Sequence, residues 1–129
     1  MHRRRILIAF CAALAACACA GAPAYAQQDA RARQEIAHLL DFVAQSGCQF
    51  ERNGSWHDSK AARDHLQEKY AYLQRRDLAP DAHAFIERAA TQSSLSGKPY
   101  HVRCGSQAPI TSAQWLNGEL ARYRAAQPR

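Results

Sequence analysis

The stretch CQFERNGSWHDS, residues 48–59, contains the signals for a tight turn between two short strands. Asn53-Gly54 is the preferred pair for a two-residue hairpin turn, because both central residues of such a turn need a positive φ. Short runs of alternating apolar and polar residues flank the pair and predict a β-hairpin over about residues 49–57. Because an isolated hairpin of this length is only marginally stable, it must pack against helices.

Helices are predicted on both sides of the hairpin, since apolar residues recur there at intervals of three and four. The preceding helix is expected to run from Ala30 to a stop at Gly47, a residue suited to a left-handed cap. The following helix, about residues 60–76, is expected to be capped by Asp58 or Ser59. The hairpin is therefore expected between these two helices along the chain and packed on helices.

Two further helices are predicted in the second half of the chain. Pro80 opens one of them with Asp81 in its first turn, and Thr111 or Ser112 caps the last. The residues expected to face the core on the four helices are Ile36, Leu39, Leu40, Val43, Ala62, Leu66, Tyr70, Leu73, Phe85, Ile86, Ala89, Ala90, Trp115, Leu116, Leu120 and Tyr123.

The stretch SSLSGKPYHVRC, residues 93–104, combines a polar loop with a strand. Its Gly-Lys pair is followed by proline, whereas a phosphate-binding P-loop needs Ser or Thr there and then a helix. Leu95 stands three residues before Lys98, so the Ser-x-x-Lys nucleophile motif is absent as well. The stretch thus predicts a turn at Ser96-Gly97 leading into a strand that ends at Cys104. The expected fold is α+β and mostly helical, with about four helices on a two- or three-stranded antiparallel sheet and one disulfide.

The first 26 residues have the pattern of a secretory signal peptide. A run of three arginines precedes an apolar segment over residues 6–20, and Ala24-Tyr25-Ala26 provides a small-x-small cleavage site. A second interpretation is a lipoprotein signal over residues 1–16, with lipidation at Cys17 and a tether over residues 17–30. Both predict an exported protein with one globular domain over residues 27–129, in the periplasm or tethered to a membrane that faces it.

The charge balance argues against nucleic acid as a partner. The whole chain has a net charge of +6, but three of its arginines lie in the predicted signal. From Gln27 onward, 14 Lys and Arg stand against 11 Asp and Glu, which leaves +3. Charges of both signs are interspersed along that part, and such a balance is poor evidence for binding to nucleic acid. A membrane is an expected partner only if Cys17 is lipidated.

Two cysteines remain outside the predicted signal, Cys48 and Cys104. In an oxidising compartment such a pair is expected to form one disulfide, and the alternative is two unpaired buried thiols. A Cys-x-x-Cys pair, as a catalytic thiol site would need, does not occur.

The candidate binding residues are polar side chains that the fold could gather from the hairpin, the second helix and the loop before the last strand. If these elements meet, a basic patch able to hold a carboxylate or phosphate results. In the alternative interpretation, Asn53 only makes the turn and the charges are solvated. The candidates are Arg52, Asn53, His65, Lys69, Ser96, Lys98, Tyr100 and Arg103, and the aromatic residues expected to frame the patch are Trp56, Tyr70, Tyr72 and Tyr100.

The histidines show no metal-binding spacing such as His-Glu-x-x-His. Glu35 and His38 lie one helical turn apart and could share a proton or a metal, although such a pair is more often a surface hydrogen bond. The sequence therefore predicts no catalytic residue, metal site or cofactor.

The segments EIAHLLDFVAQSGCQFERNG, AARDHLQEKYAYL, SSLSGKPYHVRCG and WLNGELARYR resemble the YfeK-like family of small exported proteobacterial proteins. The resemblance extends over about residues 35–124 and implies an exported single-domain protein with an uncharacterised role. It implies no catalytic residues, and it supports the pairing of Cys48 with Cys104.

The functional prediction is a small exported, disulfide-linked binding or accessory module of the bacterial envelope. Its expected partner is an envelope protein or an anionic envelope polymer. One alternative is a small hydrolase or transferase acting on envelope glycans or lipids, with His65 or His38 and an acidic partner as its machinery. Another is a structural protein that forms homodimers through its last helix.

Overall fold

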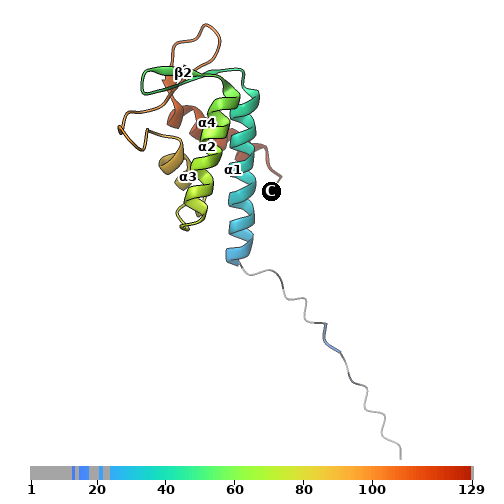
Figure 1. Cartoon of the computed structure of the whole chain (residues 1–129). Coiled ribbons are helices and arrows are strands. Elements are labelled where there is room, and N and C mark those ends of the chain that lie inside the picture. The colour runs from blue at the N-terminus through green and yellow to red at the C-terminus, as the bar shows by residue number, and fades with distance from the viewer. Residues whose placement is uncertain (1–12, 14, 18–20, 22–23, 129) are drawn as a thin grey trace, which may run out of the picture.

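The computed structural model describes residues 13, 15–17, 21 and 24–128, and within them four helices and four strands. α1 and α2 stand side by side, α4 crosses behind them, and the hairpin lies across one end of the pair, between the end of α1 and the start of α2 (Figure 1). The elements in chain order are α1 (Ala24–Gln45), β1 (Gln49–Arg52), β2 (Ser55–His57), α2 (Ser59–Gln74), α3 (Ala82–Ala89), β3 (His101–Arg103), β4 (Ile110–Thr111) and α4 (Ser112–Ala126).

The strands form one antiparallel sheet in the order β2-β1-β3-β4. Phe50 on β1 pairs with His57 on one side and with Val102 on the other. The prediction of two or three strands is therefore one strand short. The missed strand, β4, has only two residues and directly precedes α4, so it has no room for the alternating pattern that marks a strand.

Cys48 and Cys104 form a disulfide with their Cα atoms 4.4 Å apart, which confirms the predicted pair. Cys48 directly precedes β1 and Cys104 directly follows β3. The bridge therefore joins the neighbouring ends of the two central strands, where the pairing of Gln49 with Arg103 already brings the chains together.

The core lies between the helices and one face of the sheet, and Phe85 on α3 is its largest fully buried side chain. The predicted inward-facing residues are buried except Ala62, Trp115 and Tyr123, which are half-buried. The Trp115 ring packs at the rim of the core, 4.5 Å from the ring of Phe42 between centroids. The helical periodicity thus identified the core correctly on all four helices.

Two helix starts differ from the prediction. α1 begins at Ala24 rather than Ala30, because the residues before Ala30 are mostly good helix formers although they carry no apolar stripe. α3 begins at Ala82, since the Asp81 side chain accepts a hydrogen bond from the Ala84 N–H and so acts as the N-cap. Pro80 therefore precedes the helix and does not open it.

The predicted N-cap Asp58 is confirmed: its carboxylate accepts a hydrogen bond of 2.8 Å from the Ala61 N–H. Asp58→Ala leaves this N–H without its partner, so we expect the free energy of unfolding to fall by about 1 kcal/mol. Urea denaturation measures the loss. Asp64→Ala, an exposed position on the same helix, is the control and should change stability by less than about 0.5 kcal/mol. Equal losses in the two variants would contradict the role of Asp58.

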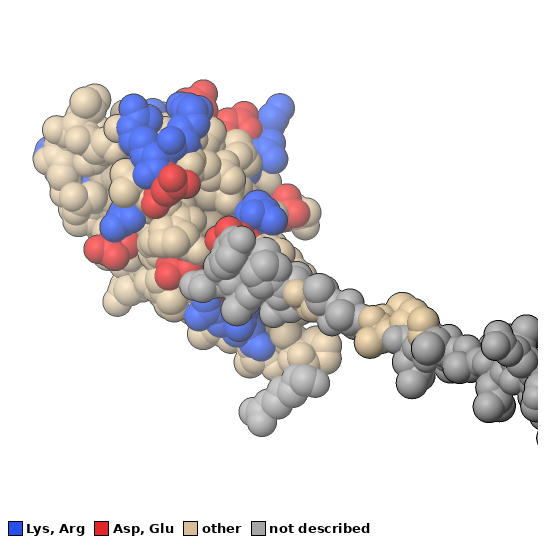
Figure 2. All heavy atoms as spheres, turned by 90° about the horizontal axis from the view of Figure 1, so that it is seen from below, with Lys and Arg blue, Asp and Glu red and all other residues tan. Residues whose placement is uncertain are grey.

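Most of the predicted signal segment, including residues 1–12, 14, 18–20 and 22–23, lies outside the described residues. Cys17 is described and is an exposed free cysteine. Among the residues that the structure describes, no helix is long and apolar enough to cross a bilayer. Lys and Arg side chains are intermixed with Asp and Glu on the face of the molecule seen from below (Figure 2).

Candidate functional site

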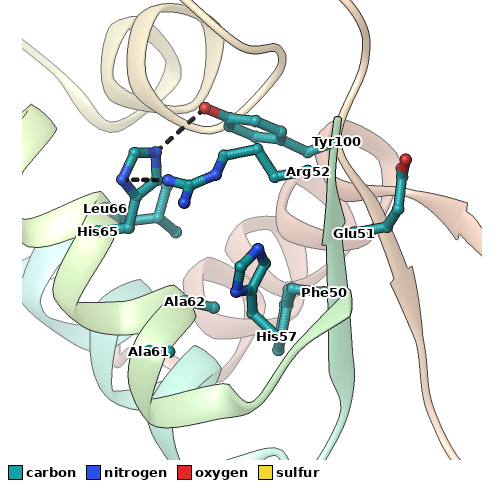
Figure 3. Close-up of a pocket in the computed structure, with 9 residues that line it drawn as sticks. All are labelled: Phe50, Glu51, Arg52, His57, Ala61, Ala62, His65, Leu66 and Tyr100. Atoms are coloured by element: carbon teal, nitrogen blue, oxygen red, sulfur yellow. Dashed lines mark hydrogen bonds between the residues drawn. The ribbon is translucent and has the colours of Figure 1, made fainter. Parts of the chain in front are cut away.

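The hairpin turn determines which side chains of β1 face α2. Asn53 and Gly54 both have positive φ, 51° and 83°, as the sequence predicts for this turn. Because side chains alternate along a strand, Phe50 and Arg52 face α2 and Glu51 points to the opposite face of the sheet (Figure 3). The Glu51 carboxylate there accepts hydrogen bonds from the Gly54 N–H and the His101 ring.

A pocket of about 100 Å³ lies between the hairpin, α2 and Tyr100. Arg52, His65 and Tyr100 point toward one another at one end of it, and apart from Glu51 and His57 the other lining residues are apolar (Figure 3). The residues that line it are Phe50, Glu51, Arg52, His57, Ala61, Ala62, His65, Leu66 and Tyr100.

A chain of hydrogen bonds connects the polar residues of this pocket. The Arg52 guanidinium lies 2.7 Å from Nδ1 of His65, and Nε2 of His65 lies 3.2 Å from the Tyr100 hydroxyl. Lys69, one turn further along α2, donates to the same hydroxyl at 3.2 Å and to the carbonyl of Gln92 at 3.1 Å. The Lys69 ammonium also lies 5.0 Å from the centroid of the Tyr100 ring. Arg52, His65, Lys69 and Tyr100 are called the cationic cluster below.

The partners of His65 determine its protonation. A guanidinium can only donate, so Nδ1 of His65 accepts from Arg52 and carries no proton. The ring proton then lies on Nε2 and is donated to the oxygen of Tyr100. That oxygen accepts from both His65 and Lys69, so the hydroxyl hydrogen of Tyr100 points away from both. His65 is therefore neutral, and Tyr100 has a hydrogen left to donate.

The electrostatics agree with this assignment. Burial lowers the pKa of His65, and the nearby positive charges of Arg52 and Lys69 lower that pKa further. Burial, followed by the charge of Arg52, also lowers the pKa of Lys69. Burial raises the pKa of the Tyr100 hydroxyl, although Arg52 opposes the change. Each shift disfavours the form with more charge, as expected for ionisable groups in a partly dry site.

Within the described part of the chain, Arg52 and Lys69 have no ion-pair partner. The basic side chains that lie within 4.0 Å of a carboxylate there are Arg31, His38, Arg63, His101, Arg122 and Arg124. Two half-buried cations without a counter-ion are unfavourable unless water or a ligand compensates them. The cluster offers donors and few acceptors, which is the chemistry of an anion site.

The loop over residues 93–98, which contains three serines, supports the hairpin and does not line the pocket. Asn53 donates to Ser93 Oγ at 3.2 Å and accepts from Ser96 Oγ at 2.5 Å. Ser93 Oγ also accepts the N–H groups of Leu95 and Ser96, so the loop is a closed turn, as predicted. These hydrogen bonds fix the hairpin turn, which directly follows Arg52, against the loop that contains Ser93 and Ser96. Lys98 is exposed and is not among the pocket residues.

Arg103 lies on the opposite face of the sheet from the cationic cluster. Its guanidinium stacks over the Trp56 ring, 4.1 Å from the centroid, and donates to Gln49 at 2.6 Å. The expected convergence therefore holds for Arg52, His65, Lys69 and Tyr100 and is wrong for Arg103.

Of the aromatic residues expected to frame the patch, only Tyr100 lines the pocket. Tyr70 packs edge-on against Phe85 in the core, and Tyr72 is exposed beneath the Arg76 guanidinium. The pocket residues that the sequence reasoning missed are Phe50, Glu51, His57, Ala61, Ala62 and Leu66. In a hairpin whose two-residue turn is Asn53-Gly54, His57 lies opposite Phe50. This register can be read from the sequence, so it could have identified Phe50 and His57 as neighbours in the pocket.

Glu35 and His38 do not interact with each other, contrary to the expected pairing. Glu35 accepts two hydrogen bonds from Arg124, at 2.6 and 2.9 Å, and His38 lies 2.8 Å from the carboxylate of Glu119. Both contacts join α1 to α4 and stabilise the fold. Within the described residues, no group of three or more His, Cys, Asp or Glu is placed to hold a metal ion.

Comparison with known proteins places this architecture in a family. A family model described as a family of unknown function (DUF5329) matches residues 30–124. The uncharacterized protein YfeK of Salmonella typhimurium is 35% identical over 79 residues, which are 60% of this chain and 64% of that protein. The match thus spans slightly less than two thirds of the relative's length. No solved structure matches the chain. Because the family model extends over almost the whole folded domain, as the YfeK-like resemblance predicts, the chain belongs to the family of unknown function DUF5329.

Proposed function

We propose that this protein is an exported binding module of the bacterial envelope that holds an anionic group of its partner in the pocket beside α2. The observation that carries the proposal is the cationic cluster, in which Arg52 and Lys69 lie without a carboxylate partner among the described residues. The proposal of export rests on the N-terminal sequence pattern.

The hydrogen-bond inventory supports an anion over a cation or a neutral polar group. A guanidinium has five N–H donors, and one of those of Arg52 is used by His65. The Tyr100 hydroxyl accepts twice and keeps its own hydrogen to donate. A carboxylate or phosphate oxygen can accept from both groups, and charge-assisted hydrogen bonds of this kind are the strong ones.

The same inventory favours binding over catalysis. Both ring nitrogens of His65 are engaged, one by Arg52 and the other by Tyr100. A general base needs a ring nitrogen directed at the substrate and usually a carboxylate that orients the ring. The Glu51 carboxylate points away from the pocket (Figure 3). Noncovalent recognition of an envelope polymer or of an envelope protein with an exposed carboxylate is the function that these contacts support best.

The test is a titration of the oxidised protein with acetate and with inorganic phosphate, followed by the NMR signals of the His65 and Tyr100 rings. We expect saturable shifts confined to residues around the pocket. Arg52→Gln should raise Kd at least about tenfold, because a hydrogen bond to a charged group contributes about 1.5–3 kcal/mol.

The matched control is Arg103→Gln, which removes the same charge from the opposite face of the same sheet. It should change Kd by less than about twofold, because salt screens the interaction between the Arg103 charge on the far face and an anion in the pocket. Equal weakening by the two variants would mean that the anion responds only to net charge, and the proposal would fail.

A further inference from the structure

We propose that the pocket selects amphipathic anions, namely short-chain aliphatic carboxylates of about four carbons in all, over hydrated inorganic anions. The inference rests on the proposed function, because it takes the cationic cluster as the anion site. It adds the identity of the group attached to the anion.

Apart from the ring of His57, the wall of the pocket opposite the cationic cluster is apolar. The apolar lining consists of the buried side chains of Phe50 and Leu66 together with Ala61 and Ala62 on α2. Figure 3 shows Phe50, Ala61 and Ala62 at one end of the pocket with the ring of His57 beside them, and Arg52, His65 and Tyr100 at the other end, where Leu66 lies next to His65. A site for phosphate or sulfate alone would surround the ion with donors. This pocket instead offers donors on one side and hydrocarbon on the other.

The small side chains on α2 create the space. Ala61 and Ala62 stand on the first turn of α2 beside the hairpin, and neither reaches far enough to fill the gap to Phe50. A cavity of 150 Å³ lined by apolar side chains holds one benzene molecule. By that scale, about 100 Å³ accommodates about four carbon atoms in all, as in butyrate, whose carboxylate oxygens then lie at the cationic cluster.

The cluster and the apolar wall together fix the orientation of a ligand. Its carboxylate accepts hydrogen bonds from Arg52 and Tyr100, and its alkyl group lies against Ala62 and Phe50. Burial of each methylene group is expected to strengthen binding about fourfold until the apolar end of the pocket is full. Two sources of this chemistry fit equally, a free short-chain carboxylate and the C-terminal carboxylate of a peptide that ends in an aliphatic residue.

The experiment titrates the oxidised full chain with acetate, butyrate, isovalerate and octanoate at constant ionic strength, with inorganic phosphate as the reference anion. We expect butyrate to bind about tenfold or more tightly than acetate, and octanoate to bring no gain in proportion to its length. Equal affinity for acetate and butyrate would overturn the selection of aliphatic carboxylates and leave the anion site intact. No saturable binding of any anion would overturn the proposed function itself.

A substitution in the apolar wall tests whether that wall causes the preference for butyrate over acetate. Ala62→Leu fills the space beside Phe50, so the ratio of butyrate to acetate affinity should fall below about three. Ala121→Leu, an exposed position on α4, adds the same side chain elsewhere and should leave that ratio unchanged. Thermal unfolding checks that both variants fold. A ratio that survives Ala62→Leu in a folded protein would place the alkyl group outside the pocket and contradict the proposal.

The two sources are separated with a short peptide ending in Ala-Leu, as the free acid and as the C-terminal amide. Binding of the acid, at least about tenfold tighter than that of the amide and of butyrate, would identify a peptide C-terminus as the ligand. Binding of butyrate but not of the acid peptide would identify a free short-chain carboxylate. Equal binding of the acid and the amide would contradict recognition through the carboxylate.

Discussion

Removal of the Cys48–Cys104 disulfide is expected to lower the free energy of unfolding by about 4 kcal/mol. The two cysteines are 56 positions apart, and a cross-link of that span removes much of the conformational entropy of the unfolded chain. The loop that it closes contains the hairpin, α2, α3 and β3. Small domains have a total stability of about 5–15 kcal/mol, so the reduced protein should be marginally folded at 37 °C.

Urea denaturation of the oxidised protein and of a Cys48→Ser/Cys104→Ser variant measures this loss. Cys17→Ser is the matched control, because Cys17 is exposed and is not part of the bridge. It should leave the denaturation midpoint unchanged. A loss below about 1 kcal/mol in the double variant would show that the packing of the sheet on the helices holds the two strand ends together without the bridge.

Arg124→Met is expected to lower the free energy of unfolding by about 3 kcal/mol at pH 7. The variant leaves the carboxylate of Glu35, a residue only 4% exposed, without its bidentate partner. Breaking a buried pair in this way usually costs about 3–5 kcal/mol, and the partial exposure of Arg124 argues for the lower end. Arg33→Met, an exposed position on α1, should change stability by less than about 0.5 kcal/mol.

The pH dependence gives this prediction a second readout. The hydrogen bonds from Arg124 hold the pKa of Glu35 below its ordinary value, although burial opposes the shift. The native protein therefore gains stability from this pair above the pKa of an unfolded glutamate and loses it as the pH falls through the pKa of the folded state. Without Arg124, burial is opposed only by the weaker effects of the Arg31 and His83 charges, so the pKa of Glu35 should rise and acid should relieve the penalty by protonating the group.

The stability difference between wild type and Arg124→Met should therefore shrink as the pH is lowered from 7 toward 4. Glu35→Gln in the Arg124→Met background should recover most of the loss, because an amide is less costly to bury than a carboxylate. A difference that stays constant with pH, or no recovery in the double variant, would mean that Arg124 acts through packing and not through its charge.

The alternation along a strand predicts the face to which a side chain points, but it does not predict which residues of other elements that side chain meets. Alternation predicts that Arg103 points away from the face of Tyr100 and Val102, and the structure places it there, over Trp56. The grouping of Arg103 with His65 was therefore at odds with a pattern already visible in the sequence. No comparable pattern relates Arg52 to Tyr100, which meet only because β1 and β3 pair through Phe50 and Val102.

The missed features are those without a local signal. β4 exists because Ile110 reaches Val102, and two residues cannot show a period of two. The neutral state of His65 depends on Arg52, which is 13 positions away, and on Tyr100, which is 35 positions away. Similarly, Glu35 pairs with Arg124, 89 positions away, and not with His38 one turn along its own helix.

The sequence alone was sufficient for the hairpin turn, the buried faces of the four helices and the cysteine pair. It also limited two helix caps to Asp58 or Ser59 and to Thr111 or Ser112, of which the structure uses Asp58 and Thr111. The turn, the caps and the helix faces each depend on residues within a few positions of one another, or on the period of a single element, so the local chain determines them. The tertiary structure decided which cations meet, which histidine is neutral and where space remains beside α2. Those properties depend on distances between elements far apart in the chain, which are set only when the sheet and helices pack.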